Sequence, residues 1–147
     1  MTHRSLGSLC GLLIVSTGAF GCSSSSPPAA DGGPLSPTFT NVYQAILEPQ
    51  CSLHHAAGAA DSFLTFETQA NAYKTLVNVK ASGPACGIVT PAETRVVPGS
   101  ASTSLLYQKV SEATPPCGSQ MPLNANPLSA ANQALIEDWI NAGAPNN

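Results

Sequence analysis

One cysteine and two histidines fall within the five-residue segment Cys51-Ser52-Leu53-His54-His55. Residues four positions apart share one face of a helical turn, so the Cys51 thiol and the His55 imidazole can reach one bound group together. This is the spacing of the c-type haem attachment motif C-x-x-C-H, in which the cysteines form thioethers and the histidine ligates the iron. Here His54 replaces the second cysteine. One thioether from Cys51 and one axial bond from His55 remain geometrically feasible.

A second axial ligand is available further along the chain, in the segment 117–123. Met121 lies there in an expected loop, and Pro122 restricts the backbone beside it. The methionine thioether is a soft ligand that binds haem iron and raises its reduction potential. We therefore take His55 and Met121 as the candidate metal ligands.

The same residues could in principle form a zinc or copper site or the active site of a hydrolase. Cys51, His54, His55 and Met121 are ligand types that suit zinc or copper. Adjacent histidines on a helix point about 100° apart, however, which strains a site that uses both with Cys51. A hydrolase is disfavoured because there is no G-x-S-x-G turn and the Cys51/His55 pair lacks a third member. We expect no enzymatic activity.

The N-terminus predicts export and a lipid anchor. Arg4 precedes a run of apolar and small residues over 6–20, which suits a signal peptide and is short for a membrane span. Gly21-Cys22 at its end resembles a bacterial lipobox, so residues 1–21 would be removed and Cys22 lipidated. Ordinary secretion with cleavage nearby is the alternative. Residues 22–37, rich in Ser and Pro, predict a flexible tether. We expect a periplasmic or outer-membrane-anchored lipoprotein.

The composition narrows the class of protein further. Of 147 residues only 9% are charged, with five Lys and Arg against eight Asp and Glu. A nucleic-acid partner is excluded because the chain cannot present a basic surface. At 43% hydrophobic residues, it also does not resemble a disordered tail. Five cysteines fit an oxidising compartment.

Three cysteines would remain after processing at Cys22, namely Cys51, Cys86 and Cys117, so one cannot pair within the chain. A Cys86–Cys117 disulfide would leave Cys51 for a thioether and would brace the loop that holds Met121. Pairing Cys51 with either of the others would leave no covalent haem. The sequence does not decide between these connectivities, and we carry Cys86–Cys117 forward as the working pair.

Short helices joined by Pro- and Gly-rich loops are expected from residue 38 onward. They cover 41–47, limited by Pro49, and 67–79; a third is capped by Ser102 and a fourth by Ser129. Glu137 and Asp138 are expected to face solvent. No run is long enough for a sheet. The apolar stripe of the last helix consists of Leu135, Ile136, Trp139 and Ile140. The predicted fold class is mainly α, with about four short helices over 38–147.

The order of helix, Cys/His motif, further helices, Met-Pro loop and terminal helix resembles the cytochrome c family of class I topology. Across about 39–144 it looks like short secreted cytochrome-like lipoproteins. The residues that carry this likeness are Arg95-Val96-Val97-Pro98-Gly99, Ser104-Leu105-Leu106, Met121-Pro122, Leu128-Ser129 and Ile136-Glu137-Asp138-Trp139-Ile140-Asn141-Ala142-Gly143-Ala144.

The resemblance implies a monohaem c-type electron carrier with Cys51 as thioether, His55 as proximal ligand and Met121 as distal ligand. Its partner would be a redox protein that docks at an exposed haem edge, and its membrane contact would be the lipid anchor. The alternative is a haemless relative with a structural or interaction role, stapled by a disulfide. For Arg95 we expect a surface position rather than a contact with a haem propionate.

Overall fold

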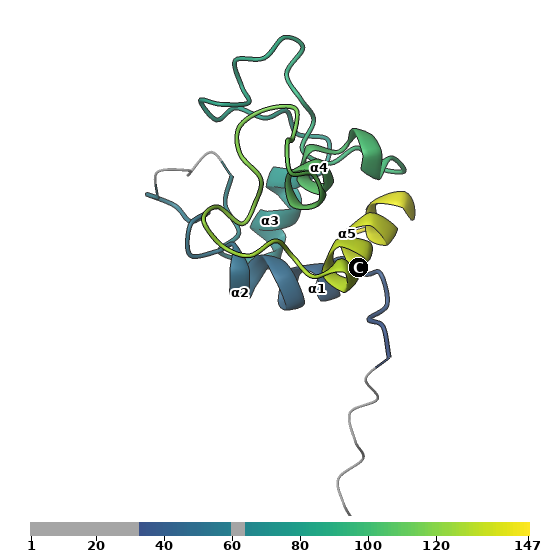
Figure 1. Cartoon of the computed structure of the whole chain (residues 1–147). Coiled ribbons are helices and arrows are strands. Elements are labelled where there is room, and N and C mark those ends of the chain that lie inside the picture. The colour runs from purple at the N-terminus through teal and green to yellow at the C-terminus, as the bar shows by residue number, and fades with distance from the viewer. Residues whose placement is uncertain (1–32, 60–63) are drawn as a thin grey trace, which may run out of the picture. The chain divides into compact units, whose positions relative to one another are not determined.

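The computed structural model describes residues 33–59 and 64–147, and this part of the chain is mainly helical (Figure 1). Because its first three elements are consecutive, they form one helical stretch, so the expectation of about four short helices is confirmed. Two isolated bridges, Val77–Val96 and Lys80–Thr94, are the only strand-like pairings in these ranges. The elements are α1 (Phe39–Val42), the π-helix η1 (Tyr43–Leu47), α2 (Glu48–Gln50), α3 (Gln69–Leu76), the 3-10 helix η2 (Ala101–Thr103), α4 (Leu105–Ser111) and α5 (Ala130–Asn141).

The first helical stretch is longer than the sequence predicted. Thr38 caps it, since its hydroxyl accepts a hydrogen bond of 3.2 Å from the Asn41 N–H. Pro49 does not stop the helix but lies in its last turn. Proline has no N–H, so the Ala45 carbonyl loses its usual donor, and the Gln50 side chain donates to that oxygen instead at 3.4 Å. The stretch therefore reaches the residue before Cys51.

The limits of the second and third helices differ from the expected ones. Thr68 caps α3, but the helix ends at Leu76 because Val77 turns into extended backbone and bridges to Val96. Ser102 is not the cap of α4, as it lies inside η2. Ser104 occupies the cap position instead, fully buried, and its hydroxyl donates to the Ser100 carbonyl at 2.7 Å. The tight turn before α4 is thus fixed by a side chain that the capping pattern did not single out.

The last helix matches the prediction most closely. The Ser129 hydroxyl accepts from the Asn132 N–H at 3.2 Å, and the expected apolar stripe is buried. Trp139 is fully buried with its ring centroid 5.0 Å from that of Phe39, which joins α5 to α1. Only Asp138 of the predicted acidic face is exposed. Glu137 is half-buried and accepts a hydrogen bond from the Tyr107 hydroxyl at 2.9 Å.

Two long irregular segments, 80–100 and 112–128, connect the helices: the first extends away from α1, and the second runs back past α2 to the start of α5 (Figure 1). A small buried cluster of Ala81, Cys86, Leu105 and Cys117 joins them, separate from the main core formed by the helices. Among residues 33–59 and 64–147, no helix has the length and apolar character needed to cross a membrane.

Candidate functional site

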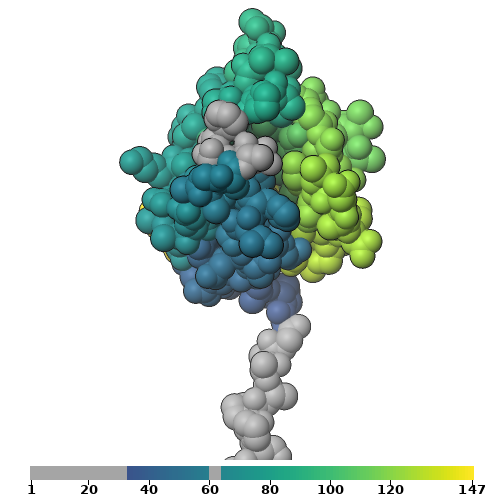
Figure 2. Space-filling model, turned by 90° about the vertical axis from the view of Figure 1, so that its left-hand side faces the viewer, coloured from purple at the N-terminus to yellow at the C-terminus, as the bar shows by residue number. Residues whose placement is uncertain are grey.

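A cavity of about 420 Å³ lies between the helices and the irregular segments. That volume falls within the range of roughly 300–1,000 Å³ common for small-molecule and cofactor sites. Its walls come from the turn after α2, from 81–86, from α4 and from 121–125. In the space-filling view the blue residues that follow the first helical stretch meet the yellow-green 112–128 segment along a seam (Figure 2). Cys51, His55 and Met121 all line this cavity, although the sequence holds Met121 far from the other two.

The Cys51–His55 segment forms the turn that its spacing predicted. Cys51 is the C-cap residue that follows α2, and its N–H donates to the Leu47 carbonyl at 3.0 Å. The His55 N–H in turn donates to the Cys51 carbonyl at 2.9 Å, which closes one helical turn. The Cys51 and His55 side chains therefore come from the two ends of one turn, and both line the same cavity.

Cys51 carries a free, half-buried thiol. Burial raises its pKa from 9.0 to about 11, because the thiolate would lose its hydration in this environment. The thiol lies 3.8 Å from the Ile46 carbonyl oxygen, the weak hydrogen bond expected for sulfur. At neutral pH the group is thus a protonated thiol facing an apolar space.

The two histidines have different surroundings. His55 is half-buried, with its ring centroid 5.3 Å from that of Phe66, and its carbonyl accepts from the Phe66 N–H at 2.7 Å. His54 is exposed at the edge of the same cavity. The replaced motif position therefore lies at the solvent-facing rim, whereas His55 is fixed against the core.

Met121 is half-buried and packs against the main core from the irregular segment. Its N–H donates to the Lys109 carbonyl at 2.7 Å, which ties this segment to α4. The other sulfur of 117–123 belongs to Cys117, which is bonded to Cys86 and does not line the cavity. The sequence-based choice of Met121 thus falls on a residue of the cavity wall.

The structure contradicts the surface position expected for Arg95, which is only 6% exposed and lines the cavity. Its guanidinium donates to the Thr75 carbonyl at 2.8 Å and to the Ser82 hydroxyl at 3.1 Å. Burial lowers its pKa. The side chain was misjudged because a charged residue is almost always placed outside unless its partners are known, and these partners are distant in the sequence.

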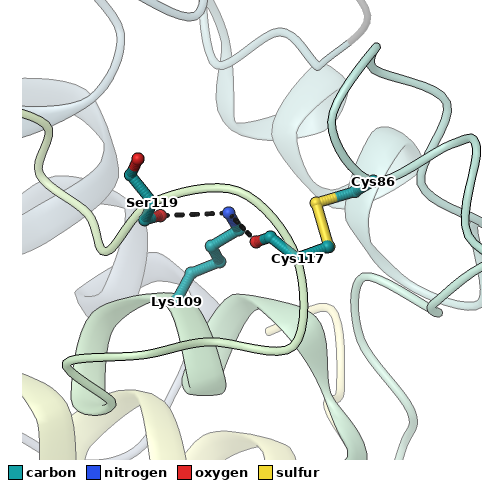
Figure 3. The surroundings of a disulfide bond; sticks show 4 residues. All are labelled: Cys86, Lys109, Cys117 and Ser119. Atoms are coloured by element: carbon teal, nitrogen blue, oxygen red, sulfur yellow. Dashed lines mark hydrogen bonds between the residues drawn. A yellow bond between two sulfur atoms is a disulfide. The ribbon is translucent and has the colours of Figure 1, made fainter.

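Lys109 is a second cation that sequence reasoning missed. It lines the cavity from α4, and its amine donates to the carbonyls of Cys117 and Ser119 (Figure 3). Among the described residues of the lining, Arg95 and Lys109 carry formal positive charge and no carboxylate is present. The chain has only five Lys and Arg, and two of them line one largely apolar cavity. The small number of cations was the feature of the sequence that could have drawn attention to them.

The disulfide prediction is confirmed, since Cys86 and Cys117 are bonded with their Cα atoms 5.2 Å apart. The alternative pairings with Cys51 are excluded by this bond. Cys86 also lines the cavity, so the disulfide joins 81–86 directly to the segment that holds Met121. The braced loop expected from cysteine parity is therefore present.

The remaining predictions are the metal-site alternative and the features of the N-terminus. Among residues 33–59 and 64–147, no three His, Cys, Asp or Glu side chains lie close enough together to bind one metal ion. The structure therefore does not support the alternative of a zinc or copper site built from these residue types. The signal peptide over 1–21, the lipidation site at Cys22 and most of the 22–37 tether lie outside the described residues.

Comparisons of the chain with protein-family models, with curated proteins and with solved structures find no match.

Proposed function

We propose that this chain is a lipid-anchored or secreted monohaem c-type electron-transfer protein of cytochrome c-like fold. Cys51 would hold the haem by one thioether, and His55 and Met121 would be its axial ligands. The bound iron would alternate between Fe(II) and Fe(III) and so carry one electron. The observation that carries the proposal is the meeting of these three residues, chosen from the sequence by ligand type and spacing, around one cavity.

The charge of the cavity supports a ligand of this class. Arg95 and Lys109 give it a positive field, while its other walls are largely apolar side chains such as Phe66, Leu105 and Leu106. An apolar body with carboxylate groups complements such a cavity, because the carboxylates meet cations and the body leaves water. Haem, with a flat apolar ring and two propionates, has this chemistry.

The chain's own residues would do three things for electron transfer. The apolar walls exclude water and lower the local dielectric constant, which sets the reduction potential together with the ligands. His55 is held by the turn and by Phe66, so little would need to move on binding. The exposed Leu53 and Leu123, 85% and 55% accessible, flank the site on two segments and would meet the redox partner. Cys22 would anchor the chain, with 22–37 as tether.

The first test is expression of the full chain in a host with a cytochrome c maturation system. We expect a Soret absorption band, and haem that stays with the polypeptide on a denaturing gel. Cys51→Ala should lose covalent haem. Met121→Ala should keep it but lose the far-red charge-transfer band of methionine-ligated ferric haem. Cys22→Ala should release the protein from the membrane fraction.

The matched control is His54→Cys, which rebuilds the complete C-x-x-C-H motif at an exposed position. It should raise the haem-loaded fraction, since maturation systems act on both cysteines. If the wild-type chain is colourless and His54→Cys binds haem, the host machinery is the obstacle. A chain that stays colourless in both forms contradicts the proposal and favours the haemless structural lipoprotein, for which the disulfide already supplies a staple.

A further inference from the structure

The segment 112–128 reaches the cavity without a helix of its own, so its position depends on a few attachments. Four of them lie within the five residues 117–121. Cys117 is bonded to Cys86, the carbonyls of Cys117 and Ser119 accept from the Lys109 amine, and the Met121 N–H donates to the Lys109 carbonyl at 2.7 Å. Lys109 thus holds the segment by both its side chain and its main chain.

Lys109 is a firm point of attachment. It lies in the last turn of α4, next to the buried Val110, and α4 packs against α5. Figure 3 shows the amine beneath the arch of chain from Cys117 to Ser119, with one bond to each end, the Ser119 bond being 3.0 Å long. An ammonium group bound to carbonyl oxygens makes charge-assisted hydrogen bonds, which are stronger than neutral ones.

Gly118, between the two accepting carbonyls, provides an independent sign of this fit. It has φ +58°, and a Cβ atom placed there would lie 2.7 Å from the Lys109 amine and 3.3 Å from the Ala85 Cβ. A side chain at this position would have to displace the amine, so the observed position of the amine requires glycine here. The backbone and the side chain are therefore fitted to each other at this point.

We propose that Lys109 is a positioning residue that fixes Met121 at the cavity wall. Through Cys117 and Ser119 its amine sets the path of the chain, and through its carbonyl it holds the Met121 backbone. The identity of Met121 as an iron ligand rests on the proposed function. The ordering of its segment by the Lys109 amine does not.

The test compares Lys109→Met with Lys74→Met in the full chain. Lys74 is exposed on α3, so its replacement controls for the loss of one positive charge. Residue-resolved hydrogen exchange on the haem-free protein should show the Met121 amide exchanging about tenfold faster in Lys109→Met, as for the loss of a charge-assisted hydrogen bond. Lys74→Met should leave it unchanged. Lys109→Arg, which can donate to both carbonyls, should restore most of the protection.

In the haem-loaded protein, Lys109→Met should weaken the far-red methionine charge-transfer band while covalent haem is retained. If Lys109→Met does not fold, Gly118→Ala serves instead, since its methyl group displaces the amine from the carbonyls. Unchanged exchange at the Met121 amide in a folded variant overturns the proposal. A wild-type chain without haem would refute the proposed function alone, because the exchange comparison is still decided on the haem-free protein.

Discussion

The helices and the irregular segments of this domain are held together in different ways. The helical side has one continuous core, centred on fully buried Trp139, Phe39 and Ile46. The irregular side has a small cluster around the Cys86–Cys117 disulfide, and it is also held by side-chain hydrogen bonds from Arg95 and Lys109, each of which donates to more than one partner. The cavity lies where these two regions meet, with Cys51 and His55 from the first and Met121 from the second. Burial thus fixes one wall of the site, and a covalent bond with a few polar contacts fixes the other.

The largest effect is expected from Trp139→Ala, in the core of the helical side. The substitution removes a fully buried ring, its contact with Phe39 and the bond from its Nε1 to the Pro145 carbonyl. The free energy of unfolding should fall by about 3–5 kcal/mol, measured by urea denaturation. Asp138→Ala, at the exposed neighbouring position, should change it by less than about 0.5 kcal/mol. Equal effects of the two variants would contradict the view that burial in the core holds the helical side together.

The second test removes the covalent support of the irregular side in the double variant Cys86→Ser and Cys117→Ser. The bond spans a sequence separation of 31, and its loss should cost about 3–4 kcal/mol by the loop-closure estimate. Hydrogen exchange should quicken first in 80–100 and 112–128, with α5 protected until global unfolding. Uniform acceleration, α5 included, would show that the two regions unfold as one unit.

In the haem-free protein the Cys51 thiol, at the boundary of the two regions, gives the free energy of unfolding a pH dependence. Its folded pKa of about 11 lies above the ordinary value of 9.0, so folding favours the protonated thiol. The contribution is complete below pH 9 and is lost as the pH rises through about 11. The stability difference between wild type and Cys51→Ala should therefore fall by at most about 2–3 kcal/mol over that interval. Denaturation of both proteins at matched pH measures it, and a constant difference across the interval contradicts a buried thiol.

The smallest effect is expected at Ser129, the cap of α5. Ser129→Ala leaves the Asn132 N–H without its acceptor and should cost about 1 kcal/mol in thermal or urea unfolding. Ser129→Asp keeps an acceptor at the cap and should retain most of the stability. Similar losses in both variants would assign the effect to packing at the helix entrance rather than to the cap.

The parts of the fold that the sequence predicted well depend on neighbours in the chain. The Ser129 cap and the apolar stripe of α5 arise within one helix, and the Cys51–His55 turn closes on itself through one main-chain bond. The helix limits that were predicted wrongly depend on residues far apart in the sequence, or on a side chain that replaces a missing main-chain hydrogen bond. Pro49 lies within the helical stretch, where the Gln50 side chain donates to the Ala45 carbonyl that the proline leaves without a main-chain donor. The helix α3 ends early because Val77 pairs with Val96.

The candidate site shows the same division. Residue type and the spacing of the haem attachment motif pointed to Cys51 and His55, and the thioether ligand type, together with the cytochrome c resemblance, pointed to Met121. Arg95 and Lys109 could not be placed in this way, because burial of a cation depends on carbonyl and hydroxyl partners that the fold supplies. Nor could cysteine parity choose among the pairings.

The sequence by itself determined the kind of domain and the donors available to its site, because capping, helical periodicity and ligand chemistry are local properties. The tertiary structure decided that Met121 shares a cavity with Cys51 and His55, that two cations line this cavity, and that Cys86 bonds to Cys117. These are encounters between segments far apart along the chain. Their geometry is set by how the helices pack and how the connecting segments close over them, which no local pattern encodes.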